Sequence, residues 1–358
     1  GSSDEPRPGF DRWVSFRGQG VYNNPTFNID GEKVRRDGYM TDLLTDYAVE
    51  WLEAREDKPF FLYLSHKAVH GDFQPAPRYE GTYDGKEYPR PDSMANTDEN
   101  YEGKPEWVRE QRDSWHGVDG MYNNNLDFNT FTQRYAEALR AVDDSVARVV
   151  EALRQQDLLD STLLVFTSDN GFQFGEHGLI DKRTMYEASI RVPLLVHCPE
   201  LIEPGTRRDE MILNIDYAPT FLEAAGVPIP DTVQGRSFYG LLDDSRTDWR
   251  DEWLYTYYWE RSFPQTPTVL GVRTDRHKLM QFHGIWDKYE LYDLENDPHE
   301  MNNLLGDYIQ DDEAGTLDHF IRRTAPKDLE VLFAHMKERL NRLLKETGCA
   351  REPNWQPR

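Results

Sequence analysis

Apolar residues recur at the three- and four-residue spacing of an amphipathic helix in three parts of the chain: residues 41–55, 131–155 and 328–347. The positions between them are mostly polar or charged, so we expect each helix to bury one side and expose the other. The stretch at 131–155 has the most regular pattern, with an apolar face that runs from Tyr135 to Leu153. These stretches are the main helices that the sequence predicts.

Short apolar runs, rich in branched or aromatic residues, lie between the helical patterns. They span residues 59–65, 163–166 and 192–196, and polar or turn residues bound each of them. Runs of this kind are typical of buried parallel strands. Because a predicted helix precedes each of the first two strands, the alternation predicts an α/β fold with a mostly parallel, doubly wound central sheet.

The pattern changes after a charged stretch at residues 243–250. Four short strand candidates follow, separated by turns: 253–259, 269–274, 278–282 and 289–294. They predict a small antiparallel sheet, which the helix at 328–347 closes. We therefore expect two domains, an α/β domain at 1–245 and an α+β subdomain at 246–358.

Several smaller features complete the prediction. We expect a short strand at 211–214, followed by a helix that Asp216 caps and that Gly226 ends. Residues 1–38 are rich in glycine, proline, asparagine and aromatics, which indicates a surface excursion. Residues 80–130 show little periodicity, which indicates an irregular functional loop or a disordered segment.

Charge and composition narrow the classes of partner. The formal net charge of -24 argues against nucleic acid, whose binding depends on neutralising phosphates. It would also repel a sulfated polymer at long range, so a sulfate group would need a local cationic pocket. No run approaches the roughly 18 apolar residues of a membrane span. The two cysteines, Cys198 and Cys349, make no disulfide framework, and the oligomeric state stays open.

Reactive side chains concentrate between the runs at 163–166 and 192–196. Asp169 and Asn170 follow the first run, at the strand end where open α/β sheets bind ligands. A carboxylate beside an amide carbonyl offers two hard oxygen ligands, which suit Ca²⁺ or Mg²⁺. Lys182 and Arg183 supply positive charge for an anionic group. The sequence therefore predicts a metal-assisted anion site here.

The motifs in this region resemble those of a known family. They are Ser168-Asp169-Asn170-Gly171, Gly175-Glu176-His177-Gly178, Ile180-Asp181-Lys182-Arg183, Tyr186-Glu187 and Arg191-Val192-Pro193-Leu194. Together they resemble the type I sulfatases of the alkaline-phosphatase-like superfamily, and most of all the N-acetylglucosamine-6-sulfatase branch. Ser65 to His70 resembles the family's strand-then-Ala-Pro-His element, with Val69 in place of proline.

This resemblance implies a role for each matching residue. Asp169 and Asn170 would bind Ca²⁺, in preference to Mg²⁺. Lys182 would contact the sulfate, and His70 would act as the general acid because its ordinary pKa lies near neutrality. Further side chains, with either a sugar contact or an internal role, are Asp181, Arg183, His177 and His283. For Asp181 and Arg183 the internal alternative is an ion pair.

The nucleophile element of the family is missing, as are the paired N-terminal aspartates that complete its metal site and its Gly-Lys-Trp-His element. The nucleophile of these sulfatases is a formylglycine made from a Cys/Ser-x-Pro-Ser/Ala-Arg motif, and neither Cys198-Pro199-Glu200 nor Cys349-Ala350-Arg351 matches it. We therefore expect the C-terminal part of a periplasmic or extracellular glycan sulfatase, inactive without an N-terminal segment. Two alternatives remain: a phosphodiesterase or phosphatase of the same superfamily, and a non-catalytic protein that binds sulfated glycans.

Overall fold

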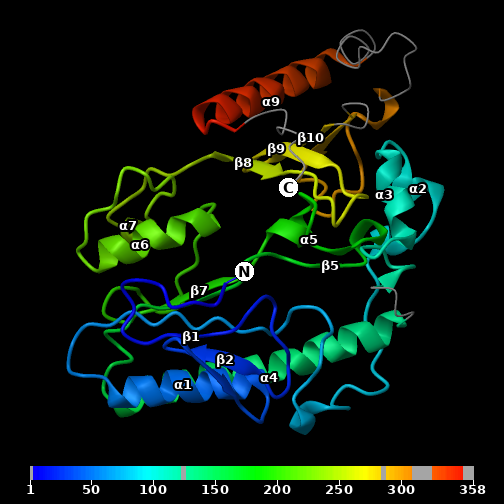
Figure 1. Cartoon of the computed structure of the whole chain (residues 1–358). Coiled ribbons are helices and arrows are strands. Elements are labelled where there is room, and N and C mark those ends of the chain that lie inside the picture. The colour runs from blue at the N-terminus through cyan, green and yellow to red at the C-terminus, as the bar shows by residue number, and fades with distance from the viewer. Residues whose placement is uncertain (1–2, 122–125, 284–287, 309–324, 350–358) are drawn as a thin grey trace. The chain divides into compact units, whose positions relative to one another are not determined.

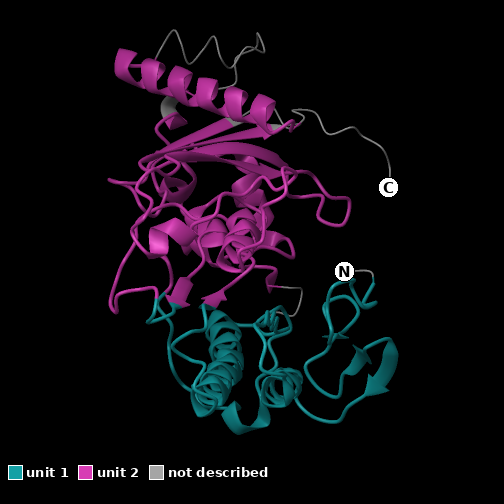
Figure 2. Ribbon diagram, turned by 90° about the vertical axis from the view of Figure 1, so that its left-hand side faces the viewer, with its two compact units in different colours: residues 1–89, 126–164, 197–200 teal, residues 90–125, 165–196, 201–358 magenta. Residues whose placement is uncertain are grey.

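The computed structural model describes residues 3–121, 126–283, 288–308 and 325–349. Contacts divide the chain into two compact units that interleave along the sequence. Unit 1 holds residues 1–89, 126–164 and 197–200, and unit 2 holds residues 90–125, 165–196 and 201–358 (Figure 2). The predicted boundary near residue 245 falls inside unit 2, and it stays a prediction.

Two helices form the main body of unit 1. Helix α1 (Met40–Ala54) packs along α4 (Phe128–Gln155), and Thr45 Oγ1 bonds Ser145 Oγ between them at 2.7 Å. Both predicted helices are confirmed. Each has a regular apolar face, which is stable when it packs against another apolar face. The first part of the chain adds an antiparallel sheet of three short strands: β1 (Val14–Ser15), β2 (Thr26–Ile29) and β3 (Glu32–Arg35) (Figure 1).

The predicted strand at 59–65 is absent from unit 1. Exposure alternates along this run as it would in a strand: Leu62 and Leu64 pack against the helices, whereas Phe61 and Tyr63 are 55% and 75% exposed. A strand is defined by its hydrogen-bonded neighbour, and no described residue forms a ladder with this run. The apolar run predicted a buried strand, and both the burial of Phe61 and Tyr63 and the pairing are wrong.

Unit 2 contains the predicted antiparallel sheet. Its strands are β8 (Glu252–Tyr257), β9 (Thr268–Thr274), β10 (His277–His283) and β11 (Lys288–Asp293), in the order β11-β10-β9-β8. Helix α9 (Lys327–Glu346) lies across one face, where Phe333, Met336 and Leu340 join the core (Figure 1). The sheet and the closing helix are confirmed. None of the described helices is long and apolar enough to cross a membrane.

Two small sheets carry the motif region. Strand β4 (Leu164–Thr167) pairs with β7 (Leu194–His197), and β5 (Gln173–Phe174) pairs with β6 (Ile180–Asp181). Strands β4 and β7 form at the predicted runs, but they are not fully buried, because Phe166 is 37% exposed and Leu195 is 64% exposed. Helix α5 (Glu187–Ile190) lies between β6 and β7.

Asp216 differs from its prediction. Residues 211–213 form no strand, and a 3₁₀ turn, η6 (Asn214–Asp216), leads into α6 (Tyr217–Ala224). The Asp216 carboxylate does not cap α6. It is fully buried, accepts from the backbone N–H of Leu213 and Arg236, and pairs with Arg250. The predicted helix end holds, because Gly226 lies in the left-handed region at φ 67°.

The stretch at 80–130 is more ordered than its composition suggested. Short helical turns fill its described part: η2 (Asp92–Met94), α2 (Asp98–Tyr101), α3 (Glu106–Glu110) and η3 (Gln111–Asp113). Trp107 and Val108 lie in the same core cluster as Tyr186 and Tyr292. The remaining short helices are η1 (Pro77–Tyr79), η5 (Glu176–Gly178), α7 (Tyr239–Leu242) and η7 (Gly306–Tyr308).

Candidate active site

The turn after β4 presents two oxygen donors. Helix α5 fixes its backbone, because Gly171 N–H donates to Ser189 O at 2.9 Å. The two backbones lie so close that a Cβ on Gly171 would be 2.3 Å from Ala188 O. Asn170 Nδ2 donates to Gly171 O at 2.7 Å, which leaves the amide oxygen Oδ1 as the acceptor. The Asp169 side chain is exposed.

These donors fit a hard cation but do not complete its coordination. A carboxylate and an amide oxygen are ligands that Ca²⁺ and Mg²⁺ prefer, and Ca²⁺ takes about 6–8 of them. Among the described residues, no group of three or more His, Cys, Asp or Glu side chains is arranged to hold a metal ion. Asp169 and Asn170 would therefore supply part of a metal site.

His177 lies in the interior. Its backbone has φ 59°, its side chain is 2% exposed, and its ring stacks on Tyr186 at 4.0 Å between centroids. Burial, together with Lys104, holds the pKa of His177 well below its usual value, so the ring is neutral. This packing offers no face to a sugar, and we therefore remove His177 from the candidate contacts.

The three residues 181–183 have different surroundings. Asp181 is 5% exposed and forms an ion pair with Arg183, which is the internal alternative that the sequence left open. The Arg183 guanidinium lies 3.5 Å from the centre of the Phe263 ring. Lys182 is half-buried and forms no hydrogen bond or ion pair with any residue that the structure describes. It is the cation of this loop that internal contacts do not neutralise.

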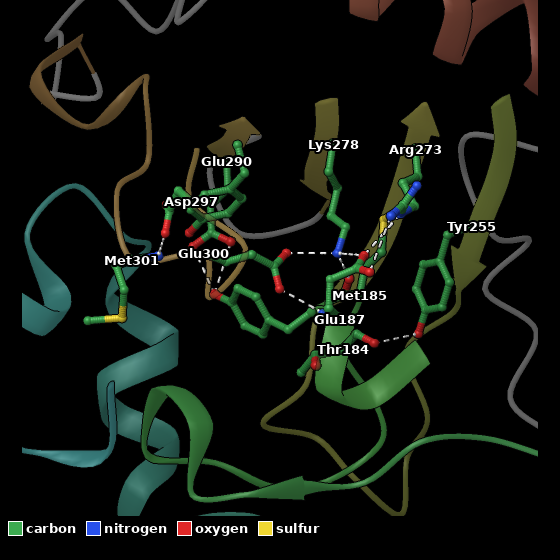
Figure 3. Close-up of polar contacts among 12 residues, drawn as sticks. Thr184, Met185, Glu187, Tyr255, Arg273, Lys278, Glu290, Asp297, Glu300 and Met301 are labelled. Atoms are coloured by element: carbon green, nitrogen blue, oxygen red, sulfur yellow. Dashed lines mark hydrogen bonds and ion pairs between the residues drawn. The ribbon is translucent and has the colours of Figure 1, made fainter. Parts of the chain in front are cut away.

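A buried ionic network holds the segment that follows Lys182 (Figure 3). Lys278 on β10 is fully buried, and its Nζ lies 2.7 Å from both Glu187 Oε1 and Glu300 Oε1. It also donates to Met185 O at 2.8 Å. Burial opposes the ionisation of Glu187, yet Lys278 and Arg273 hold its pKa down at about 2. The loop is thus fixed to the sheet by a network whose centre, Lys278 and Glu300, is buried and whose Glu187 is 16% exposed.

Sequence reasoning missed Lys278 and Glu300. A pair of lysine and glutamate 22 residues apart carries no pattern that separates a buried pair from two surface residues. A polar position inside an apolar run is a signal that the sequence gives for Glu290, between Tyr289 and Leu291 of β11. Lys278, next to His277, and Glu300, outside the strands, give no such signal.

His70 belongs to unit 1, where its backbone is fixed from two sides. Its N–H donates to Lys67 O at 2.8 Å, and its carbonyl accepts from Tyr22 Oη at 2.7 Å. The neighbouring His66 bonds Ser145 Oγ at 3.0 Å. His283 ends β10 opposite Thr268, and its side chain lies outside the described residues.

Comparison with known proteins identifies the family. The sulfatase family model matches residues 2–227, and the model of the C-terminal part of N-sulphoglucosamine sulphohydrolase matches residues 175–325. The chain belongs to the sulfatase family. This membership confirms the resemblance that the motifs indicated and, with it, the alkaline-phosphatase-like superfamily.

Similar sulfatases cover most of this chain. An N-acetylglucosamine-6-O-sulfatase of Bacteroides thetaiotaomicron is 32% identical over 84% of the chain, and an N-acetylglucosamine-6-sulfatase of Bos taurus is 31% identical over 83%. The chain spans 64% and 58% of the lengths of these relatives, less than two thirds. A solved structure described as BT4656 with its substrate D-glucosamine-2-N,6-O-disulfate has a TM-score of 0.83 and 28% identity, over 98% of this chain and 79% of that one. This likeness confirms the predicted fold.

In this sulfatase-family chain we expect one buried carboxyl group to make the free energy of unfolding depend on pH near neutrality. Glu290 is fully buried and accepts from Tyr186 Oη at 2.9 and 3.0 Å, and burial raises its pKa to about 7. A raised native pKa stabilises the fold fully below the ordinary pKa of 4.5, and this contribution is lost as pH rises toward 7. The free energy of unfolding should therefore fall over this window, and less so in Glu290→Gln.

Urea denaturation of both proteins between pH 4.5 and 8 measures this difference. Glu346→Gln is the control, because Glu346 is an exposed partner of Arg342 and should leave the pH profile unchanged. Parallel pH profiles for the original chain and Glu290→Gln would contradict a neutral buried carboxyl group.

Proposed function

We propose that this chain provides the metal, sulfate and leaving-group contacts of a glycan sulfatase. The observation that carries the proposal is Lys182: it is a half-buried cation with no internal partner among the described residues, beside a neutralised Asp181–Arg183 pair. A half-buried positive charge without a partner favours an anion from outside. Membership of the sulfatase family makes a sulfate ester the anion of choice.

The proposed chemistry assigns one task to each residue. Hydrolysis breaks the bond between sulfur and the ester oxygen, so charge grows on the sulfuryl group and on the departing sugar oxygen. Lys182 would stabilise that charge, and His70 would donate a proton to the sugar oxygen. Arg183 would contact sugar hydroxyls, with its guanidinium held by the buried Asp181 carboxylate.

A divalent metal and a formylglycine are general features of the family. We propose Ca²⁺ as the metal, with Asp169 and Asn170 among its ligands, because hard oxygen donors suit it. When bound, Ca²⁺ would neutralise charge on the sulfuryl oxygens. A formylglycine would be the nucleophile, and the sequence of this chain lacks the motif from which it is made.

For the substrate we propose a glycan that carries 6-O-sulfated N-acetylglucosamine or a closely related sugar. Relatives with this activity in their names support the choice, as does the sulfated glucosamine bound in the similar structure. We place the protein in the periplasm or outside the cell, since some relatives are named extracellular sulfatases.

Sulfate release from N-acetylglucosamine-6-sulfate, followed by ion chromatography, tests the proposal. Two proteins are compared: the 358-residue chain and the complete product of its gene. We expect turnover by the complete product, its loss with a chelator, and its return with Ca²⁺. Faster release of phosphate from the matching phosphate ester would favour a phosphatase, and binding of the sulfated sugar without turnover would favour a non-catalytic binder.

A further inference from the structure

A segment outside the recognised motifs pairs with the strand that leads to Lys182. His116 O accepts from Ile180 N–H at 2.7 Å, and Val118 N–H donates to Gly178 O at 3.0 Å. Gly117 and Leu179 form the antiparallel bridge between these bonds. Residues 116–118 therefore extend the β5–β6 pair along its other edge, all within unit 2.

The His116 side chain reaches Asp181. It is 5% exposed, and its Nε2 lies 3.0 Å from Asp181 Oδ2. A carboxylate oxygen only accepts hydrogen bonds, so Nε2 carries the proton and donates it. Burial, with Arg183 and Lys182 nearby, lowers the pKa of His116 to about 4, and the imidazole is therefore neutral at physiological pH.

One aromatic ring supports both partners of Asp181. The Phe263 ring lies 4.9 Å from the His116 ring and 3.5 Å from the Arg183 guanidinium carbon. The backbone of Asp181 has φ 88°, a value that residues other than glycine rarely adopt. A residue held there needs contacts that fix it, and His116 and Arg183 both bond the same oxygen, Oδ2.

We propose that His116 is a positioning residue: it fixes the carboxylate of Asp181, which in turn holds the guanidinium of Arg183 where it can contact the sugar beside Lys182. This inference rests on the proposed function, in which Arg183 contacts sugar hydroxyls. A neutral donor suits the task, because it orients the carboxylate without competing with Arg183 for its charge.

The test uses the complete gene product with two substrates: N-acetylglucosamine-6-sulfate, and 4-nitrophenyl sulfate, which has no sugar hydroxyls. His116→Phe keeps a ring and removes the donor, so we expect the KM for the sugar to rise about tenfold with little change in kcat. His116→Gln keeps a donor and should recover most of this loss. Neither variant should change kcat/KM for the aryl sulfate.

A double-mutant cycle separates positioning from simple packing. Asp181→Asn should raise the KM for the sugar by a similar factor, and adding His116→Phe to it should cause no further rise. Val118→Ala is the matched control, because Val118 is buried in the same segment and its apolar side chain cannot donate a hydrogen bond to Asp181. It should leave both KM values unchanged.

The outcomes are distinct from those of the proposed function. If the original protein releases sulfate from neither substrate, the proposed function fails. If it does turn over the sugar, an unchanged KM in His116→Phe, or additive effects with Asp181→Asn, would overturn the positioning role alone. Should His116→Phe not fold, His116→Leu removes the donor in its place; a tenfold rise in KM for the sugar would support the proposal, and no rise would overturn it.

Discussion

Replacing Lys278 by methionine is expected to lower the free energy of unfolding by about 3–5 kcal/mol. The methionine side chain has a similar length but no donor, so it leaves Glu187, Glu300 and the Met185 carbonyl without their shared ammonium group. Glu300 lies in the interior, where an ion that loses its partner is costly because water cannot replace it, whereas Glu187 is 16% exposed and keeps its ion pair with Arg273. Denaturation in urea, monitored by tryptophan fluorescence, measures the loss.

Lys58 provides the matched control. It also forms an ion pair, with Glu56, but both side chains are about three-quarters exposed. Lys58→Met should therefore change stability by less than about 0.5 kcal/mol. Adding Glu300→Gln to Lys278→Met should recover part of the loss in free energy of unfolding, since it removes the buried carboxylate that has lost its partner. If Lys278→Met lowers the free energy of unfolding by less than about 1 kcal/mol, the network does not stabilise the fold as expected.

Replacing Lys182 by methionine is expected to reduce kcat/KM for the 6-sulfated sugar by about 10²–10³-fold in the complete gene product. The reason is that Lys182 is the loop cation without an internal partner among the described residues, and in the proposed function its charge stabilises the bound sulfate. For the same reason its removal should leave the free energy of unfolding almost unchanged. Steady-state kinetics and urea denaturation on one preparation test both statements.

Two further variants sharpen this test. Lys182→Arg keeps the positive charge and should retain more activity than Lys182→Met, although a guanidinium occupies a different volume. Lys58→Met, far along the sequence, should leave kcat/KM unchanged. Full activity in Lys182→Met, or a large loss of stability, would assign Lys182 a structural role and contradict the proposed function.

Sequence reasoning predicted well the elements whose apolar pattern is compatible with only one type of secondary structure. Helices α1, α4 and α9 have continuous apolar faces, and the four strands β8 to β11 alternate with turns, so periodicity alone identifies them. The run at 59–65 shows the limit. Its residues are almost all apolar, which predicts burial, but whether the run pairs depends on a neighbour that local pattern does not specify.

Burial of polar side chains was harder to predict. His177 lies in a glycine-rich motif beside reactive residues, and the sequence did not show that its ring stacks on Tyr186 in the core. Asp216 has the position of a helix cap and instead pairs with Arg250, 34 residues further along. Both outcomes depend on contacts between distant parts of the chain, which composition and spacing do not encode.

The ionic network around Lys278 has a consequence for protein engineering. The charged stretch at 243–250 looks like a natural crossover point for chimeras between sulfatases. A crossover there would take Glu187 from one parent and Lys278 with Glu300 from the other. Hybrids should therefore be viable only when both parents share these three residues, or when all three are exchanged as one block.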